Sequence, residues 1–185
     1  MITWRALTFS ALLAGTIVPA CAQSILLDSY GSYTDTTDSN GHYTGWTQSE
    51  SVLYPPTLTG GYAALTSLSG TITDPIPALP YGTYSYSDGS GDSLTVLVDF
   101  TAEQYSSANN FYSASGTWSF ESGTGSYAAV TSGEGTFSLT QITQTSSGSS
   151  GTLLAGVLTP APEPTTCGLL AAGAAAFVRR KRRKI

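Results

Sequence analysis

The chain has almost no basic residues outside its two ends. Of its 185 residues only seven are Lys or Arg, namely Arg5 and the run 179–184. The 140 residues from 23 to 162 contain no Lys or Arg, eleven of the twelve carboxylates and the single His. This body has no Lys or Arg to pair with a carboxylate or to hold a phosphate backbone, so nucleic acid is not an expected partner.

Cysteine is almost as scarce. Cys21 and Cys167 are the two cysteines, and both lie in terminal segments that we expect to be removed. The mature body would then have no thiol, no disulfide and no Cys-ligated metal site. A body of this size can bury roughly two thirds of its unfolded surface and does not need a disulfide to fold.

The N-terminal segment has the three parts of a secretory signal peptide. Arg5 precedes an apolar run from Ala6 to Val18, and Pro19-Ala20-Cys21-Ala22 supplies small residues before Gln23. We expect signal peptidase to cleave between Ala22 and Gln23. The run is shorter than the roughly 20 residues that a membrane span needs. An alternative is a lipoprotein, in which Cys21 would be lipidated.

The C-terminal segment also has three parts. Residues 159–164 form a Pro-rich linker containing Pro162-Glu163-Pro164, and prolines disfavour both helix and sheet. We expect a short transmembrane helix at 165–178, with its apolar core from Cys167 to Val178. A basic cytoplasmic tail would follow at 179–185, with Arg179, Arg180, Lys181, Arg182, Arg183 and Lys184. Positive charge flanks the cytoplasmic side of a span, so the body would lie outside.

This tail resembles the PEP-CTERM sorting signal of exported bacterial proteins. The resemblance implies processing near Pro162-Glu163-Pro164 by exosortase, a membrane protease or transpeptidase. It predicts a membrane-anchored precursor, transiently in the inner membrane, and then a cell-surface or extracellular protein. The alternative is a permanent tail anchor. Tails of this kind are also named ice-binding protein C-terminal domain. That name refers to the shared sorting signal and not to an ice-binding surface.

The body, residues 23–158, reads as a single all-β domain. Short runs alternate apolar and polar residues, as in 94–100 and 136–142, which is typical of half-buried antiparallel strands. About ten short strands, separated by Gly-rich turns at 88–92, 122–125 and 147–151, predict an antiparallel β-barrel or β-sandwich. Only residues 101–107 suggest a helix.

One stretch of the body has a second resemblance. Residues 116–137 contain Gly123-Thr-Gly125-Ser-Tyr127 and then Gly133-Glu-Gly135. This pattern resembles the strand-turn-strand motif of secreted barrels related to allene oxide cyclase and dirigent proteins. The resemblance implies a barrel with Tyr127 covering its mouth, and it carries no activity.

Catalytic signals in the body are weak. His42 lies in the turn-like sequence 38–43, with no second His or Cys for a metal site or a dyad, and no nucleophile elbow is present. Paired carboxylates such as Asp99 with Glu103, or Glu121 with Glu134, would serve a glycoside hydrolase. Among eleven acids, however, such spacings occur by chance. We therefore expect no enzyme, with a small polysaccharide-active enzyme as the third alternative.

The sequence leaves two kinds of ligand as alternatives, Ca²⁺ and a glycan. Asp38 and Asn40 match part of an EF-hand loop, and Asp88 and Asp92 bracket a Gly-rich turn, so weak Ca²⁺ binding is an alternative to simple turn formation. No other cofactor is expected. Trp46, in a loop-like region beside Gly45, is the candidate for an exposed glycan contact, whereas Trp118 shares an alternating run with Phe120 and should be buried.

Together these observations predict an exported surface or extracellular-matrix protein, structural or adhesive, in an exopolysaccharide-rich envelope. A glycan-binding β module is the main alternative.

Overall fold

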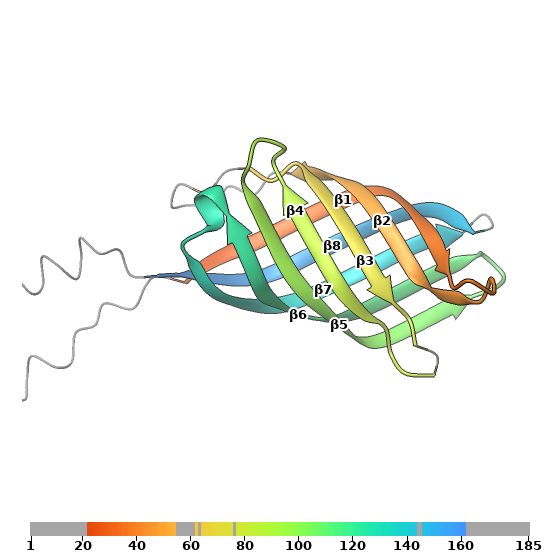
Figure 1. Cartoon of the computed structure of the whole chain (residues 1–185). Coiled ribbons are helices and arrows are strands. Elements are labelled where there is room, and N and C mark those ends of the chain that lie inside the picture. The colour runs from red at the N-terminus through yellow and green to blue at the C-terminus, as the bar shows by residue number, and fades with distance from the viewer. Residues whose placement is uncertain (1–21, 55–61, 63, 76, 144–145, 162–185) are drawn as a thin grey trace, which may run out of the picture. The chain divides into compact units, whose positions relative to one another are not determined.

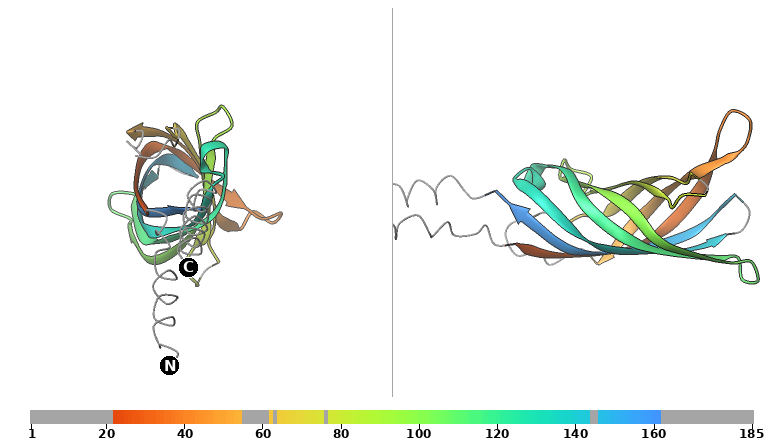
Figure 2. Two further views of the ribbon diagram at one scale, coloured as in Figure 1. Left: turned by 90° about the vertical axis from the view of Figure 1, so that its left-hand side faces the viewer. Right: turned by 90° about the horizontal axis from the view of Figure 1, so that it is seen from below.

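The computed structural model describes residues 22–54, 62, 64–75, 77–143 and 146–161, and residues Ala22–Ala161 form one compact unit. Eight strands form a closed barrel in which each strand is antiparallel to the next and β8 pairs with β1 (Figures 1 and 2). The strands are β1 (Gln23–Thr37), β2 (Tyr43–Tyr54), β3 (Ser67–Thr73), β4 (Tyr81–Ser87), β5 (Ser93–Ser106), β6 (Phe111–Thr124), β7 (Val130–Thr143) and β8 (Ser147–Pro160). Of the two predicted architectures, the barrel is confirmed.

The period-two pattern of the sequence places alternate residues inside and outside the barrel. In β3 every second residue is buried, with Leu68, Gly70 and Ile72 inside and hydroxyl residues outside. The first half of β5 does the same with Leu94, Val96, Val98 and Phe100. Successive side chains of a strand point to opposite faces, so this pattern fixes which residues fill the barrel.

The barrel has two distinct ends. The terminal end contains the start of β1, the end of β8, the turn 88–92 and a 3-10 turn, Gly125–Tyr127 (Figure 1). The distal end contains the β1–β2 turn 38–42, the β3–β4 connection 74–80 and the β5–β6 turn 107–110. Every strand therefore runs between these two ends, and its inner residues can be placed in order along the barrel.

Four strands place a buried polar layer near the middle of the interior. From the terminal end, β1 contributes Ile25 and Leu27 and then Ser29, and β8 contributes Leu158 and Leu154 and then Thr152 and Ser150. β2 likewise contributes Val52 and then Glu50 and Gln48, and β7 contributes Phe137 and Leu139 and then Gln141. The terminal half of the interior is apolar, and beyond the polar layer the buried residues nearest the distal end, Tyr33, Trp46, Ile72 and Phe100, are aromatic or aliphatic again.

The outer face over β2, β3, β4 and β5 is covered by hydroxyl side chains. Cross-strand register aligns them in rows, and we call this surface the hydroxyl face: Thr47, Thr71 and Thr83; Ser49, Ser69, Ser85 and Thr95; and Ser51, Ser67, Ser87 and Ser93. These residues are exposed or half-buried, and the Ser85 and Thr95 hydroxyls lie 3.3 Å apart. Because the barrel is closed, each described strand pairs with a neighbour on both sides over part of its length, although some strand ends, such as β5 beyond Phe100, pair on one side only.

The strands are fewer and longer than predicted. Residues 147–151, predicted as a turn, begin β8, where Gly148 and Gly151 lie beneath aromatic rings of β1. A Cβ at Gly148 would lie 2.0 Å from the backbone oxygen of Ile142 and 3.0 Å from the Tyr33 ring, whereas one at Gly151 would make ordinary contacts at 3.5 Å or more. Gly148 therefore permits close approach within the sheet rather than chain reversal.

The helix suggested at 101–107 is also wrong. Residues up to Ser106 belong to β5, where Glu103 pairs with Ala114 and Tyr105 pairs with Tyr112. A register shift between Phe100 and Ala102 interrupts the alternation, and this bulge removed the period-two signal. Ladder pairing with β6 overrides the helix propensity of Ala102, Glu103 and Gln104.

The β domain extends slightly past its predicted end. Thr159 and Pro160, predicted as linker, pair with Ser132 and Val130 at the end of β8. Gln23, at the predicted cleavage site, is the first residue of β1. The predicted signal peptide up to Cys21, the Pro162-Glu163-Pro164 motif, the helix at 165–178 and the basic tail lie outside the described residues. Among the residues that are described, no helix has the length and apolar character needed to cross a membrane.

Candidate functional site

The barrel interior holds a connected polar group around one carboxylate, which we call the Glu50 cluster: Ser29 from β1, Gln48 and Glu50 from β2, and Ser150 and Thr152 from β8. The Ser29 hydroxyl donates to Glu50 Oε2 at 2.6 Å, and the Ser150 hydroxyl donates to Oε1 at 2.6 Å. Thr152 Oγ1 and Gln48 Nε2 also donate to Oε1, each at 3.1 Å. Three adjacent strands thus surround the carboxylate with four donors.

Aromatic residues extend this network toward the barrel wall. Trp46 Nε1 donates to Gln48 Oε1 at 3.0 Å, and the Tyr84 hydroxyl lies 3.4 Å from the same oxygen. Gln48 Nε2 also donates to Thr152 Oγ1 at 2.9 Å. Gln48 therefore connects two buried aromatic residues to the carboxylate, which fixes its amide orientation.

The Glu50 carboxyl is buried without a basic partner, with 3% of its surface exposed. Burial raises the pKa of Glu50 above its ordinary value, and the hydrogen bonds from Ser150, Ser29 and Thr152 oppose this shift in part. The body has no Lys or Arg. Hydroxyl groups both donate and accept, so the same neighbours accommodate Glu50 with or without its proton.

Two further buried polar groups face the same interior. The Tyr86 hydroxyl and Gln141 Nε2 have no hydrogen-bond partner among the described residues. Gln141 is the cross-strand partner of Ser150, a donor to Glu50, and the Glu50 charge contributes to a pKa of Tyr86 that burial raises well above its usual range. The interior therefore has spare hydrogen-bonding capacity beside Glu50.

The distal end carries a second polar group, which we call the distal rim. It consists of three carboxylic acids and two tyrosines: Asp35, Asp74, Glu103, Tyr43 and Tyr112. The Tyr112 hydroxyl donates to Glu103 Oε2 at 3.0 Å. Partial burial raises the pKa of Asp74, and the nearby Glu103 raises it further. Partial burial also raises the pKa of Asp35. Acidic side chains thus surround the distal mouth.

The expectation that Trp46 is exposed is wrong. Its ring is 2% exposed, faces the barrel interior and makes edge contacts with Phe100 and Tyr112. A glycan on the outer surface cannot reach it. Trp118 is buried as predicted, and its Nε1 donates to the backbone oxygen of Ala155 at 2.9 Å.

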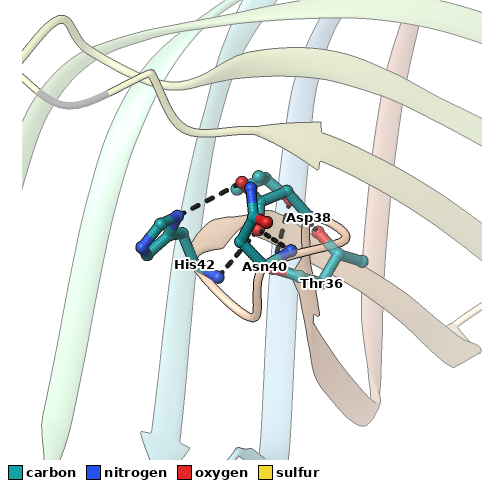
Figure 3. A network of polar contacts seen from close by, with 5 residues as sticks. Thr36, Asp38, Asn40 and His42 are labelled. Carbon is teal, nitrogen blue, oxygen red and sulfur yellow. Dashed lines mark hydrogen bonds and ion pairs between the residues drawn. The ribbon is translucent and has the colours of Figure 1, made fainter.

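The first candidate calcium loop is a hydrogen-bonded turn between β1 and β2 (Figure 3). Asp38 Oδ1 accepts the backbone N–H groups of Asn40 and His42 at 2.8 and 2.9 Å. The His42 ring contacts Asp38 Oδ2 at 3.3 Å and is largely exposed. These bonds lower the pKa of Asp38 and account for the turn without a metal.

The second candidate loop, 88–92, lies at the opposite end of the barrel. Asp88 Oδ1 accepts backbone N–H groups from Ser90, Gly91 and Asp92, and the Ser90 hydroxyl donates to Oδ2. These bonds, the Ser90 hydroxyl first, lower the pKa of Asp88 to about 2. Asp92 Oδ1 accepts the backbone N–H of Ser126 in the 3-10 turn. The four predicted calcium residues therefore form two separate turns. Within the described part of the chain, no three His, Cys, Asp or Glu side chains gather in a way that could hold a metal ion.

The register places the two suggested catalytic pairs differently. Asp99 lies on the outer face opposite Thr117, whereas Glu103 follows the bulge, lies opposite buried Ala114 and binds Tyr112 at the rim. Glu134 on β7 pairs with Ser119 on β6, and Glu121 lies two residues after Ser119, at the bulge of β6. The bulge therefore separates Asp99 from Glu103, whereas Glu121 and Glu134 lie near each other on adjacent strands.

Sequence reasoning missed the Glu50 cluster. A signal was present, because Trp46, Gln48, Glu50 and Val52 alternate with hydroxyl residues in a period of two. The segment 43–50 reads as a loop because its inner residues are polar and Gly45 interrupts it. Since polar residues rarely occupy a barrel interior without partners, only the neighbouring strands β1 and β8 show why these residues are inside.

The 3-10 turn bears out one geometric expectation at the terminal end. Gly125 has a positive φ of 58°, and Tyr127 is fully buried and stacks on Tyr62 with ring centroids 4.9 Å apart. Tyr127 therefore covers the interior at this end of the barrel. The relationship to allene oxide cyclase and dirigent proteins stays a prediction.

Comparison with known proteins identifies the tail. Residues 160–183 match the family model of the PEP-CTERM protein-sorting motif. No curated protein and no solved structure was found to match the chain. The chain therefore carries a PEP-CTERM sorting motif, which supports export through an exosortase-type system to the surface or the extracellular space.

Proposed function

We propose that the barrel is a non-catalytic, adhesive surface or matrix protein, delivered by its sorting motif to a polysaccharide-rich envelope. The observation that carries this proposal is the outer surface. Rows of Ser and Thr cover β2 to β5 in cross-strand register on the outside of a closed barrel. Such a surface forms many exchangeable hydrogen bonds with a hydrated polymer.

The placement of the carboxylates supports a non-catalytic role. Glu50 is enclosed by hydroxyl groups in the barrel interior, and Asp38 and Asp88 cap turns. Glycoside hydrolysis needs two carboxyl groups set about 5 Å or about 6.5 to 9.5 Å apart around an accessible bond. A buried Glu50 and two turn-capping aspartates do not meet that requirement, and the accessible Asp99 and Glu134, which line one hollow, are tested by the sugar-release assay below.

The adhesive role is tested with a strain that lacks the protein. We expect its cells to detach more readily under flow and to release more matrix polysaccharide, and the wild-type gene to restore retention. The variant Glu50→Gln should restore it equally, because it keeps the side-chain volume. Purified protein should release no reducing sugar from a polysaccharide panel. Unchanged retention in the deletion strain, or sugar release that a carboxylate variant abolishes, would overturn the proposal.

Processing is tested separately by mass spectrometry of the surface form. We expect the polypeptide to begin at Gln23 and to end near Pro162. A variant in which Pro162, Glu163 and Pro164 are all Ala should instead keep its basic tail and accumulate in the membrane fraction. A wild-type surface form that retains Arg179–Lys184 would contradict exosortase processing, and one beginning at a lipidated Cys21 would show the lipoprotein alternative.

A further inference from the structure

The outer face of β5 to β8 carries three adjoining hollows, which we call the outer groove. The first, of about 450 Å³, is lined by Glu103, Gln104 and Ser113 to Ser115. The second, of about 360 Å³, shares Ser115 with the first and Thr117 and Thr136 with the third. The third, of about 600 Å³, lies between Asp99, Ser119, Glu134 and Val157. Each volume is within the range of about 300 to 1,000 Å³ that is common for small-molecule sites.

The hollows follow the direction of β6. Their shared residues run from Ser113 through Ser115 and Thr117 to Ser119, which is six residue steps or roughly 20 Å at about 3.3 Å per residue. Over this length alternate residues of the strand present hydroxyl groups outward. The groove is therefore elongated, as a site for a linear chain would be, rather than a pocket for one small molecule.

The groove is lined by both hydrogen-bonding and apolar groups and has no basic residue. Thr101, Thr117, Thr136 and Ser138 contribute hydroxyls, Asp99 and Glu134 contribute carboxylates, and Leu153, Ala155 and Val157 of β8 contribute apolar surface. Carboxylates accept hydrogen bonds from hydroxyl groups, and these charge-assisted bonds are stronger than neutral ones. An anionic polymer would be repelled by the same carboxylates, since the body has no Lys or Arg.

An exposed aromatic ring lies beside the groove. Tyr81 is 51% exposed on β4, and its cross-strand partner is Asp99, at the edge of the third hollow. Residues directly opposite each other on paired strands lie on the same face of the sheet, so Tyr81 and Asp99 both project outward. An aromatic face beside a carboxylate suits a ring with C–H groups on one face and hydroxyls at its edge.

We propose that the outer groove binds a single chain of neutral polysaccharide, with Asp99 and Glu134 accepting sugar hydroxyls and Tyr81 stacking on a sugar ring. This inference rests on the adhesive function proposed above and adds, apart from the hydroxyl face, the site that would hold a single polymer chain. It differs from the predicted Trp46 contact, because Trp46 lies inside the barrel.

The test uses protein recovered from the surface of the producing cells, run in native gels that contain dextran, mannan or anionic alginate. We expect dextran or mannan to retard the wild type and alginate not to do so. Thr117→Arg places a long side chain in the groove and should weaken retardation at least about tenfold in apparent Kd. Thr37→Arg adds the same charge at an exposed position at the end of β1, outside both the groove and the hydroxyl face, and should bind like the wild type.

Tyrosine variants refine the test. Tyr81→Ala should weaken binding roughly fivefold, the scale of one aromatic contact. Tyr30→Ala, which removes an equally exposed ring from β1, should have no effect. Melting curves of all four variants establish that each is folded.

The outcomes separate this inference from the adhesive function. Equal retardation of Thr117→Arg and Thr37→Arg would refute the groove and leave the adhesive function standing. Retardation by alginate alone, or by no polymer, would also refute the groove, while the deletion strain decides the adhesive function independently.

Discussion

Two parts of the barrel interior, the apolar terminal half and the polar layer around Glu50 at the start of the distal half, are stabilised by different interactions within the same strands. In the terminal half the inner residues are aliphatic and aromatic, and Leu27, Leu94, Leu154 and Leu158 are fully buried. In the distal half, two residues along the same strands, Ser29 and Thr152 begin a network that encloses Glu50. The apolar half removes hydrophobic surface from water, whereas the polar half provides hydrogen-bond partners for most of the polar groups that it buries, with the Tyr86 hydroxyl and Gln141 Nε2 as exceptions.

This difference shows how a barrel without basic residues buries a carboxylate. A buried charge normally needs a paired cation, and here no Lys or Arg is available in the body. Ser29, Ser150 and Thr152 provide hydroxyls instead, and these groups also suit the protonated acid. The terminal half should therefore be sensitive to volume, and the distal half to hydrogen bonding and pH.

The largest expected effect is a cavity in the apolar half. Leu154→Ala should lower the free energy of unfolding by about 2 to 5 kcal/mol, because a fully buried side chain leaves a void that its neighbours fill only in part. Chemical denaturation measures the change. The matched control is the adjacent Leu153→Ala, which faces outward and should cost less than about 1 kcal/mol. Equal losses at both positions would contradict the assignment of inner and outer faces.

A smaller loss is expected two residues along the same strand, in the polar half. Thr152→Val keeps the side-chain shape but removes the hydroxyl that donates to Glu50 and accepts from Gln48. Because Gln48 Nε2 then loses one acceptor and the carboxylate one donor, we expect a loss of about 1 to 3 kcal/mol. The same substitution at exposed Thr71 should change the free energy of unfolding by less than about 0.5 kcal/mol. If Thr152→Val were neutral, the polar half would not depend on its network.

The substitution Glu50→Gln should change how the free energy of unfolding depends on pH more than it changes the free energy of unfolding itself. Burial raises the pKa of Glu50 above its ordinary value of about 4.5. At a pH between the ordinary pKa and the raised pKa, Glu50 holds a proton in the folded protein but not in the unfolded chain. The stabilisation is full below the ordinary pKa and is lost as the pH rises through the raised one. It falls by at most about 1.4 kcal/mol per pH unit.

The measurement is the difference between the wild type and Glu50→Gln across pH 4 to 8. Asp35 and Asp74 also have raised pKa values, and they contribute equally to both proteins, so they cancel in the difference. Burial raises the pKa of Tyr84 and Tyr86, the titratable neighbours of Glu50, so both stay neutral over this range. Parallel curves for the two proteins would show that Glu50 does not keep its proton in the fold.

The apolar half could be predicted from the sequence far better than the polar half. Leu94 to Phe100 alternate with polar residues and indicate a strand directly, and the turn at 88–92 follows from its glycines and aspartates. Glu50 and Gln48 resemble surface residues in the sequence, because the hydroxyls that allow their burial come from positions about 20 and 100 residues away. The bulge after Phe100 likewise concealed the second half of β5.

The smallest expected effect is the response of the melting temperature to calcium, which concerns the two turns capped by Asp38 and Asp88. Asp38 and Asp88 each use Oδ1 to accept at least two backbone N–H groups, at the distal and the terminal end respectively. A calcium ion would have to displace those bonds and then find further oxygen ligands to complete a shell of six to eight. We therefore expect 5 mM CaCl₂ to shift the melting temperature by less than about 1 °C relative to equal ionic strength of NaCl. A larger shift that Asp88→Asn removes and Asp38→Asn does not would assign a calcium site to the terminal end, and the reverse pattern would assign it to the distal end.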